Sequence, residues 1–200
     1  MPEPTLQPRS ALAGIIQPGR LGVTAGVAGV VARDMQGFAA YSILAQKGQA
    51  VTTSQVLSEL LGATVSDGPK RVARGSLSVS GVAPGQWLLI ERQASLPTTA
   101  DLRAKLVRLA AVIDQSSGRV VLELSGNRVR STLAKGIPLD LDPRVFKPGD
   151  VAQTMTAHIG VQVALMTERP DFEVITAAST AQSFWSWLAA SAAEYGLDVV

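Results

Sequence analysis

His158 is the only histidine of this 200-residue chain, and imidazole is the one side chain that titrates near neutral pH without a perturbed environment. It is therefore the first candidate for general acid or base catalysis. No carboxylate stands near it to orient the ring, because residues 152–167 contain neither Asp nor Glu. Alternating neighbours predict a β-strand, on which a lone histidine is more often structural. We interpret His158 as structural, with contact to a partner's carboxylate or backbone as the alternative.

Asp140 and Asp142 form a second candidate site in the segment PLDLDPR. In an extended chain the two carboxylates would share one face, as a metal site or an acid/base pair requires. Pro138 and Pro143 bracket them, Arg144 can neutralise one, and no third ligand is close in sequence. A solvated loop is the favoured interpretation, and we expect no metal to bind to this chain.

A glycine-rich segment, GVTAGVAGV, contains Gly22, Gly26 and Gly29. Their spacing differs from the G-x-G-x-x-G of dinucleotide-binding loops, and no Lys-Ser/Thr pair follows, as a P-loop requires. Asp34 lies too close to serve as the acid that would bind a ribose. We therefore predict that these glycines serve packing and bind no nucleotide.

The composition indicates one well-formed hydrophobic core and little affinity for nucleic acids. Hydrophobic residues make up 46% of the chain, charged residues 17%, and the mean hydropathy is +0.23. Although the isoelectric point is about 9.2, the 18 basic and 16 acidic residues are dispersed rather than clustered. A nucleic-acid-binding module is accordingly the least favoured class.

The chain has no cysteine, which excludes disulfides, thiolate catalysis and zinc sites that need sulfur. This composition fits a reducing compartment, so we expect a cytoplasmic protein. The most apolar segment, 21–32, has only twelve residues and is rich in Gly and Ala, so we predict neither a membrane span nor a secretory signal.

The elements that must position these residues follow one order twice. We predict a proline-rich arm, residues 1–20, that becomes ordered only against another surface, and one domain, residues 21–200. The first half, about 37–110, is expected to have a strand at 39–45 and a helix at 50–61. One strand at 71–81, one strand at 86–92 and a helix at 99–110 capped by Thr99 should follow. The second half, about 111–196, is expected to begin with strands at 111–116 and 118–126 and a helix through Val129 and Leu133 capped by Ser125. Strands at 150–158, 160–166 and 172–177 follow, and a last helix runs from Ser179 or Thr180 to Tyr195.

This repeated order predicts the α+β class, with duplicated strand-helix-strands-helix subdomains and mainly antiparallel sheets. Trp87 and Phe172 occupy equivalent places, 85 residues apart. The last helix is nearly apolar around its circumference, with Phe184 at the centre of its apolar face, Trp185 near the edge and Glu194 as its one ionised side chain. Trp185 then either packs on its own sheet or contacts another subunit.

From residue 111 to residue 196 the chain resembles the gamma subunit of heterotetrameric sarcosine oxidase. The resemblance is carried by Asp-Gln-Ser followed by Gly-Arg-Val-Val, by Leu-Ala-Lys-Gly followed by Pro-Leu-Asp-Leu, and by the helix Ser-Phe-Trp-x-Trp-Leu. In the first half, DGPKRVARG and APGQWLL agree with it as well.

That family resembles in turn the folate-binding fold of the glycine-cleavage aminomethyltransferases, whose Phe-Asp-x-Ser motif matches residues 113–116. Their Gly-Gly-x-x-Asp motif corresponds to residues 159–163, Ile-Gly-Val-Gln-Val, where the acid is missing. The gamma subunits tend to have a histidine where this chain has Ser117. The resemblance implies an inherited scaffold that has lost its chemistry.

The resemblance therefore implies a non-catalytic structural or assembly subunit, with no catalytic, cofactor-binding or metal-binding residue of its own. FAD, FMN, NAD and tetrahydrofolate are implied in the partner subunits alpha, beta and delta. The alternatives are the matching subunit of an N-methylglutamate dehydrogenase and a stand-alone folate-binding aminomethyltransferase-like protein.

Overall fold

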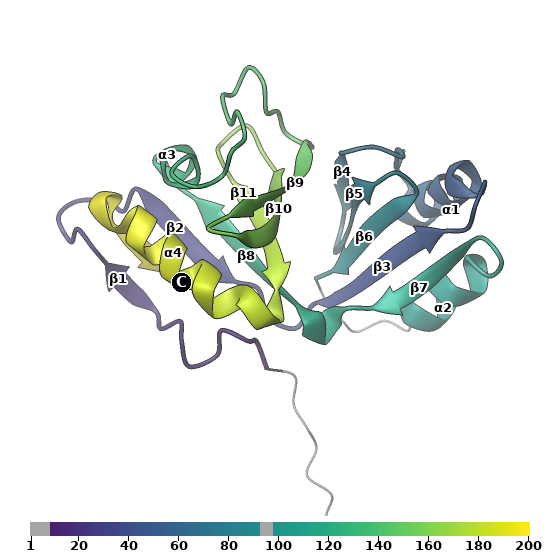
Figure 1. Cartoon of the computed structure of the whole chain (residues 1–200), viewed down its shortest axis with the longest axis horizontal. Coiled ribbons are helices and arrows are strands. Elements are labelled where there is room, and N and C mark those ends of the chain that lie inside the picture. Colours follow the sequence, from purple (N-terminus) through teal and green to yellow (C-terminus); the bar gives the residue numbers. More distant parts are fainter. Residues whose placement is uncertain (1–8, 93–97) are drawn as a thin grey trace, which may run out of the picture.

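The computed structural model describes residues 9–92 and 98–200, which form two lobes, each built on one sheet (Figure 1). The larger sheet has the strand order β1-β12-β2-β8-β11-β10-β9. Its strands are β1 Gly19–Leu21, β2 Val30–Asp34, β8 Arg119–Ser125, β9 Val151–Thr156, β10 Ile159–Leu165, β11 Phe172–Ala177 and β12 Leu197–Val199. Neighbouring strands are antiparallel except β12 and β2, which are parallel.

The smaller sheet has the order β4-β5-β6-β3-β7 and is antiparallel throughout. Its strands are β3 Ala39–Ala45, β4 Arg71–Arg74, β5 Leu77–Ala83, β6 Gln86–Glu91 and β7 Ala110–Asp114. The helices α1 Ala50–Leu61 and α2 Thr98–Lys105 belong to this lobe, and α3 Val129–Leu133 and α4 Ala181–Ala192 belong to the other (Figure 1). The order β4-β5-β6-β3 repeats as β9-β10-β11-β8, which confirms the duplicated, mainly antiparallel α+β fold.

Each sheet turns one face to its helices and the other face to the second sheet. On β8, Val120, Leu122 and Leu124 belong to the core under α3 and α4, whereas Val121 belongs to a small apolar cluster with residues of β3, β6 and β11. Strands covered on both faces need apolar side chains on both, which explains the nearly continuous hydrophobic runs of β8, β10 and β11. The equivalent residues Trp87 and Phe172 are fully buried in the two separate helix-side cores.

The ends of the chain complete the larger sheet. β1 pairs with β12, and β12 pairs with β2, although β1 and β2 lie more than 160 residues before β12 in the sequence. Leu12, in the predicted arm, is fully buried in the core of this lobe. In its described part, from residue 9 onward, the arm therefore packs on its own fold, and residues 1–8 lie outside the described residues.

Several expected boundaries differ from the structure. β7 pairs with β3 in the smaller sheet, so residues 111–114 belong to the first repeat and not to the second. The second predicted helix begins at Thr98 and ends at Lys105, so Thr99 lies inside the helix instead of capping it, and the chain is extended again from Ala110. Arg128, not Ser125, stands at the N-cap of α3, since β8 continues through Ser125.

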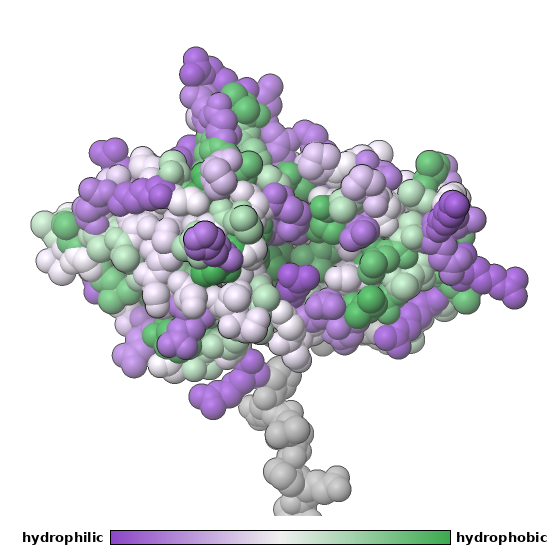
Figure 2. All heavy atoms as spheres, viewed as in Figure 1, coloured by the Kyte–Doolittle hydropathy of each residue, from purple (hydrophilic) through white to green (hydrophobic). Residues whose placement is uncertain are grey.

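Of the two alternatives for Trp185, the structure supports packing on its own fold. Trp185 is 6% exposed and belongs to the same core as Phe184 and Leu188, because α4 packs against both the sheet and α3. The exposed side of α4 is made mostly of small residues, among them Ser183, Ser186 and Ala190. Figure 2 shows the resulting pale, weakly polar surface over α4 in the left lobe. The aromatic side chains of this helix therefore serve the fold of this chain.

In the glycine-rich loop, Gly22 and Gly29 pack closely against residues that include the turn after α4, as the packing interpretation predicts, whereas Gly26 has open space around it. A Cβ atom on Gly22 would lie 2.2 Å from the carbonyl oxygen of Ala193, and one on Gly29 would lie 2.8 Å from side-chain atoms of Arg128 and Tyr195. Both distances are shorter than any side chain tolerates, so close approach of the backbone explains these two glycines. Within residues 9–92 and 98–200, no helix is long and apolar enough to cross a bilayer.

Candidate functional site

An open cleft of about 440 Å³ lies between the two sheets. Space remains there because small residues stand on the facing strands: Ser42 on β3, and Gly160 and Ala177 on β10 and β11. The remaining lining residues are Val82, Gln86, Leu88, Arg119, Gln153, Thr154, Val161, Gln162, Ile175 and Thr180. The lining contains one charged side chain, Arg119, and no carboxylate.

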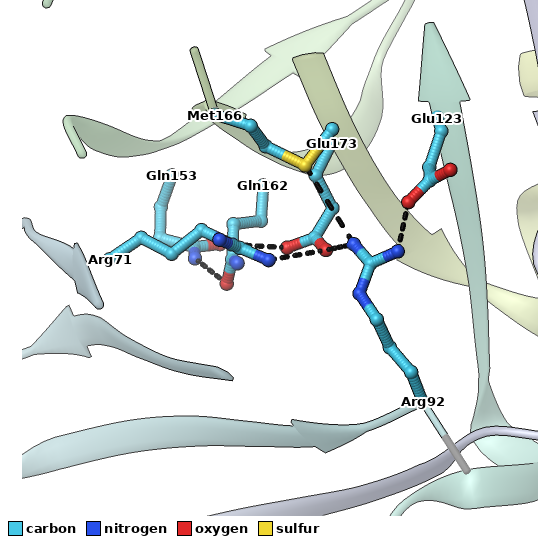
Figure 3. A network of polar contacts seen from close by, with 7 residues as sticks. All are labelled: Arg71, Arg92, Glu123, Gln153, Gln162, Met166 and Glu173. Carbon is cyan, nitrogen blue, oxygen red and sulfur yellow. Dashed lines mark hydrogen bonds and ion pairs between the residues drawn. The ribbon is translucent and has the colours of Figure 1, made fainter. Parts of the chain in front are cut away.

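A polar network beside this cleft joins the two sheets (Figure 3). Glu173 of β11 is fully buried, and both of its carboxylate oxygens accept hydrogen bonds from arginines of the other lobe. Arg71 of β4 donates from Nε to Oε1 at 2.9 Å and from Nη2 to Oε2 at 3.0 Å. Arg92, which follows β6, donates to Oε2 at 2.9 Å and also pairs with Glu123 of β8. These ion pairs of Arg71 and Arg92 with Glu173 and Glu123 connect the two lobes, and we call them the tie between the lobes.

Two hydrogen-bond donors of the cleft lack a partner in the described part of the chain. Gln162 is 4% exposed; its Oε1 accepts a bond of 2.8 Å from Nε2 of Gln153, but its own Nε2 is buried and unbonded. Nε of Arg119 is likewise buried without a hydrogen-bond partner. Buried polar groups are nearly always hydrogen-bonded in folded proteins, so two such donors in one cleft indicate a place where an acceptor fits.

The structure does not bring the residues predicted from the sequence together. His158 does not lie on a strand: it is exposed in the turn between β9 and β10, where it and Ala157 have φ angles of +65° and +46°. Asp140 and Asp142 lie in a loop and not in an extended strand; Oδ1 of Asp140 accepts a bond from the backbone N–H of Asp142. No group of three metal-ligating His, Asp or Glu side chains occurs in the described residues.

Asp142 forms a two-point ion pair with Arg144, whose Nε and Nη2 donate to its two oxygens at 2.9 and 3.0 Å. Hydrogen bonds from Arg144 lower the pKa of the Asp142 carboxyl to about 2. This pair is therefore present above the ordinary carboxyl pKa and is lost as the pH falls through about 2.

We expect Arg144→Gln to raise the pKa of Asp142 towards its ordinary value of 3.8, because the variant removes the hydrogen bonds that favour the ionised form. A side-chain carboxyl titration by NMR measures the change. Lys47→Gln, in a turn of the other lobe, is the control and should leave this titration unchanged. An Asp142 pKa that stays at about 2 in Arg144→Gln would contradict the assigned cause.

The Asp-x-Ser motif of residues 114–116 forms a turn between the lobes. Oδ1 of Asp114 accepts bonds from the backbone N–H and the hydroxyl of Ser116, at 2.8 and 2.6 Å, and the Ser116 oxygen accepts a bond from the backbone N–H of Ala40. The Ser116 hydroxyl, as the main cause, holds the pKa of Asp114 below its ordinary value. The motif thus fixes the position of β3 relative to the turn after β7.

The acid that is missing from segment 159–163 would not have been part of the cleft. Val163, the position that corresponds to the acid of Gly-Gly-x-x-Asp, is fully buried in the helix-side core. Gly160 and Gln162 alternate with it and line the cleft. A carboxylate at residue 163 would therefore face the core, and the lack of an acid in the cleft depends on its other lining residues.

The fold defines the class of this chain. It is similar in structure to the glycine cleavage system aminomethyltransferase T from Bartonella henselae, with a TM-score of 0.64 over 90% of this chain and 52% of that chain, at 15% sequence identity. This chain therefore shares the fold of that aminomethyltransferase, and at such a low sequence identity the likeness says nothing about function.

More specific matches give the family. A subunit of the heterotetrameric sarcosine oxidase from Corynebacterium sp. U-96, solved with pyrrole 2-carboxylate, matches 94% of this chain and 95% of its own length, with a TM-score of 0.78 and 25% identity. The sarcosine oxidase subunit gamma of Corynebacterium sp. strain P-1 is 31% identical over 142 residues, which are 66% of this chain and 67% of that protein. The model of the sarcosine oxidase gamma subunit family matches residues 45–194. The chain belongs to the sarcosine oxidase gamma subunit family.

Proposed function

We propose that this chain is the gamma subunit of a heterotetrameric sarcosine oxidase and that its role in the complex is structural. The observation that carries the proposal is the family match over residues 45–194, which includes strands β4 to β11 and all four α-helices. Relatives of this chain are subunits of an oxidoreductase, and this chain is a non-catalytic subunit. Of the alternatives, an N-methylglutamate dehydrogenase subunit is named by no relative described above. The stand-alone aminomethyltransferase-like protein has a structural match at 15% identity, which shows the fold alone.

The proposed complex oxidatively demethylates sarcosine to glycine and passes the one-carbon unit to tetrahydrofolate. We assign FAD, FMN, NAD and tetrahydrofolate to the partner subunits alpha, beta and delta, and we place the complex in the cytoplasm. What supports this assignment in the present chain is the lining of the inter-sheet cleft. General acid/base chemistry needs a titratable group within reach of substrate, and among the described lining residues the only charged side chain is an arginine.

Co-expression tests the proposal. We expect the chain to co-purify with its alpha, beta and delta partners in fixed stoichiometry, and sarcosine-dependent peroxide formation to occur in the complex but not with this chain alone. N-methylglutamate as a second substrate separates the two enzyme classes. A chain that turns over sarcosine by itself, or that does not associate with the partners, would contradict the structural role.

Titration with methyltetrahydropterin, a pterin without the glutamate tail, tests the folate alternative in the isolated chain. We expect no saturable binding, because the cleft offers no carboxylate to hold the pterin ring. Saturable pterin binding to the isolated chain would favour a stand-alone folate protein.

A further inference from the structure

The unbonded donors of the inter-sheet cleft indicate a ligand of definite chemistry. We propose that this cleft binds a small organic acid, whose carboxylate pairs with Arg119 and whose second acceptor group bonds to Gln162. This goes beyond the structural role, which needs no ligand in the chain itself.

Arg119 and Gln162 stand on the same face of the larger sheet. Arg119 is opposite Ala177, and Gln162 is opposite Ile175, so the two side chains flank β11 from β8 and β10, two residues apart along it. Side chains two residues apart point the same way, and β8 and β10 are two strand spacings, about 10 Å, apart. Two long side chains at this separation can bind the two ends of one short molecule, whereas they are too far apart to bind the same atom.

The charge of the cleft favours an anion. Arg119 is the one charged lining residue. On the same face, Glu173 has both oxygens engaged by Arg71 and Arg92, so it is committed to the tie between the lobes. Arg119 has no counter-ion among residues 9–92 and 98–200, and a carboxylate is the group that best matches such an arginine, since charge-assisted hydrogen bonds are roughly twice as strong as neutral ones.

The size of the cleft favours a dissolved molecule over a protein side chain as the source of that carboxylate. Its volume of about 440 Å³ falls in the range of small-molecule sites. It is bounded by a sheet on each side, and Gly160 keeps it open, because no atom lies within 4 Å of the position that a Cβ would occupy there. An acidic side chain of a partner subunit is the competing source, and the experiment separates the two.

Equilibrium dialysis with radiolabelled glutarate tests the proposal on the full chain, alone and in the assembled complex. We expect saturable binding that pentanediol, of similar length but without carboxylates, does not displace. Arg119→Gln should weaken binding at least about tenfold, because it removes the charge that pairs with the carboxylate. Gly160→Phe should block binding by filling the cleft, and it demands no unusual backbone angle, since Gly160 has no positive φ. Arg144→Gln, which removes an exposed arginine outside the cleft, is the matched control and should bind as the unmodified chain does.

Far-UV circular dichroism shows whether each variant is folded. If Arg119→Gln does not fold, Gly160→Phe still tests the proposal. The proposal is overturned if glutarate does not bind saturably in either form of the protein, or if both cleft variants bind it unchanged. It is also overturned, in favour of a partner's acidic side chain, if glutarate does not bind while Arg119→Gln abolishes co-purification with the partner subunits.

Discussion

Replacing Glu173 by Gln should lower the free energy of unfolding by about 3–5 kcal/mol, the typical loss when one partner of a buried ion pair is removed. The carboxylate is fully buried, and Arg71 is 7% exposed at its side chain, so the variant leaves an arginine charge inside the protein without compensation. Urea denaturation followed by circular dichroism measures the loss. Because small domains are stable by only about 5–15 kcal/mol, a loss of this size removes a large part of the total stability.

Glu123→Gln is the matched control, because Glu123 pairs with the same Arg92 from the neighbouring strand but is partly exposed. It should cost clearly less than Glu173→Gln. The double variant Arg71→Met with Glu173→Leu should regain part of the loss, since apolar residues of similar volume often replace a buried pair without penalty. Equal losses from Glu173→Gln and Glu123→Gln would show that burial does not decide the strength of this tie.

Trp87→Ala should lower the free energy of unfolding by about 3–5 kcal/mol, the usual range for removing a large buried aromatic side chain. The Trp87 indole is fully buried in the core of the smaller sheet, and its Nε1–H donates to the carbonyl oxygen of Ser66 at 2.9 Å. The variant leaves a cavity and also removes the donor for that carbonyl group. Denaturant unfolding again provides the measurement.

Two further variants separate the two contributions of Trp87. Trp87→Phe keeps an aromatic ring and loses the hydrogen bond, so it should cost about 1–3 kcal/mol for leaving the carbonyl unpaired. Trp187→Ala changes a half-buried tryptophan of α4 and should cost less than Trp87→Ala. A loss for Trp87→Ala no larger than that for Trp187→Ala would contradict the central position of Trp87.

The longer elements were predictable from the sequence because local patterns define them. α1 begins at Ala50 and ends at Leu61, as predicted, since its apolar stripe ends at Gly62, which takes the left-handed conformation at φ +64°. The strands β1, β2 and β12 were missed. They have only three to five residues, which is too few to show a local periodicity. Their pairing also depends on residues from distant parts of the chain.

The candidate site was less predictable than the fold. Residue type drew attention to His158 and to Asp140 and Asp142, which the structure places in a turn and in a loop. Arg119, Gly160 and Gln162 come from β8 and β10, which were predicted as strands from the sequence. Which face of each strand meets the helices and which meets the other sheet depends on packing across the whole chain, and that information is not local.

The position of β12 between β1 and β2 has a consequence for biosynthesis. The smaller sheet comes from the continuous stretch 39–114 and has all its strands as soon as that stretch has left the ribosome. The larger sheet must wait, because residues 197–199 pair with strands that are synthesised more than 160 residues earlier. Pairings across such long separations form slowly, so the early strands remain open to wrong partners for the longest time. Nascent chains of this protein should therefore depend on chaperones chiefly for the segment that contains β1 and β2.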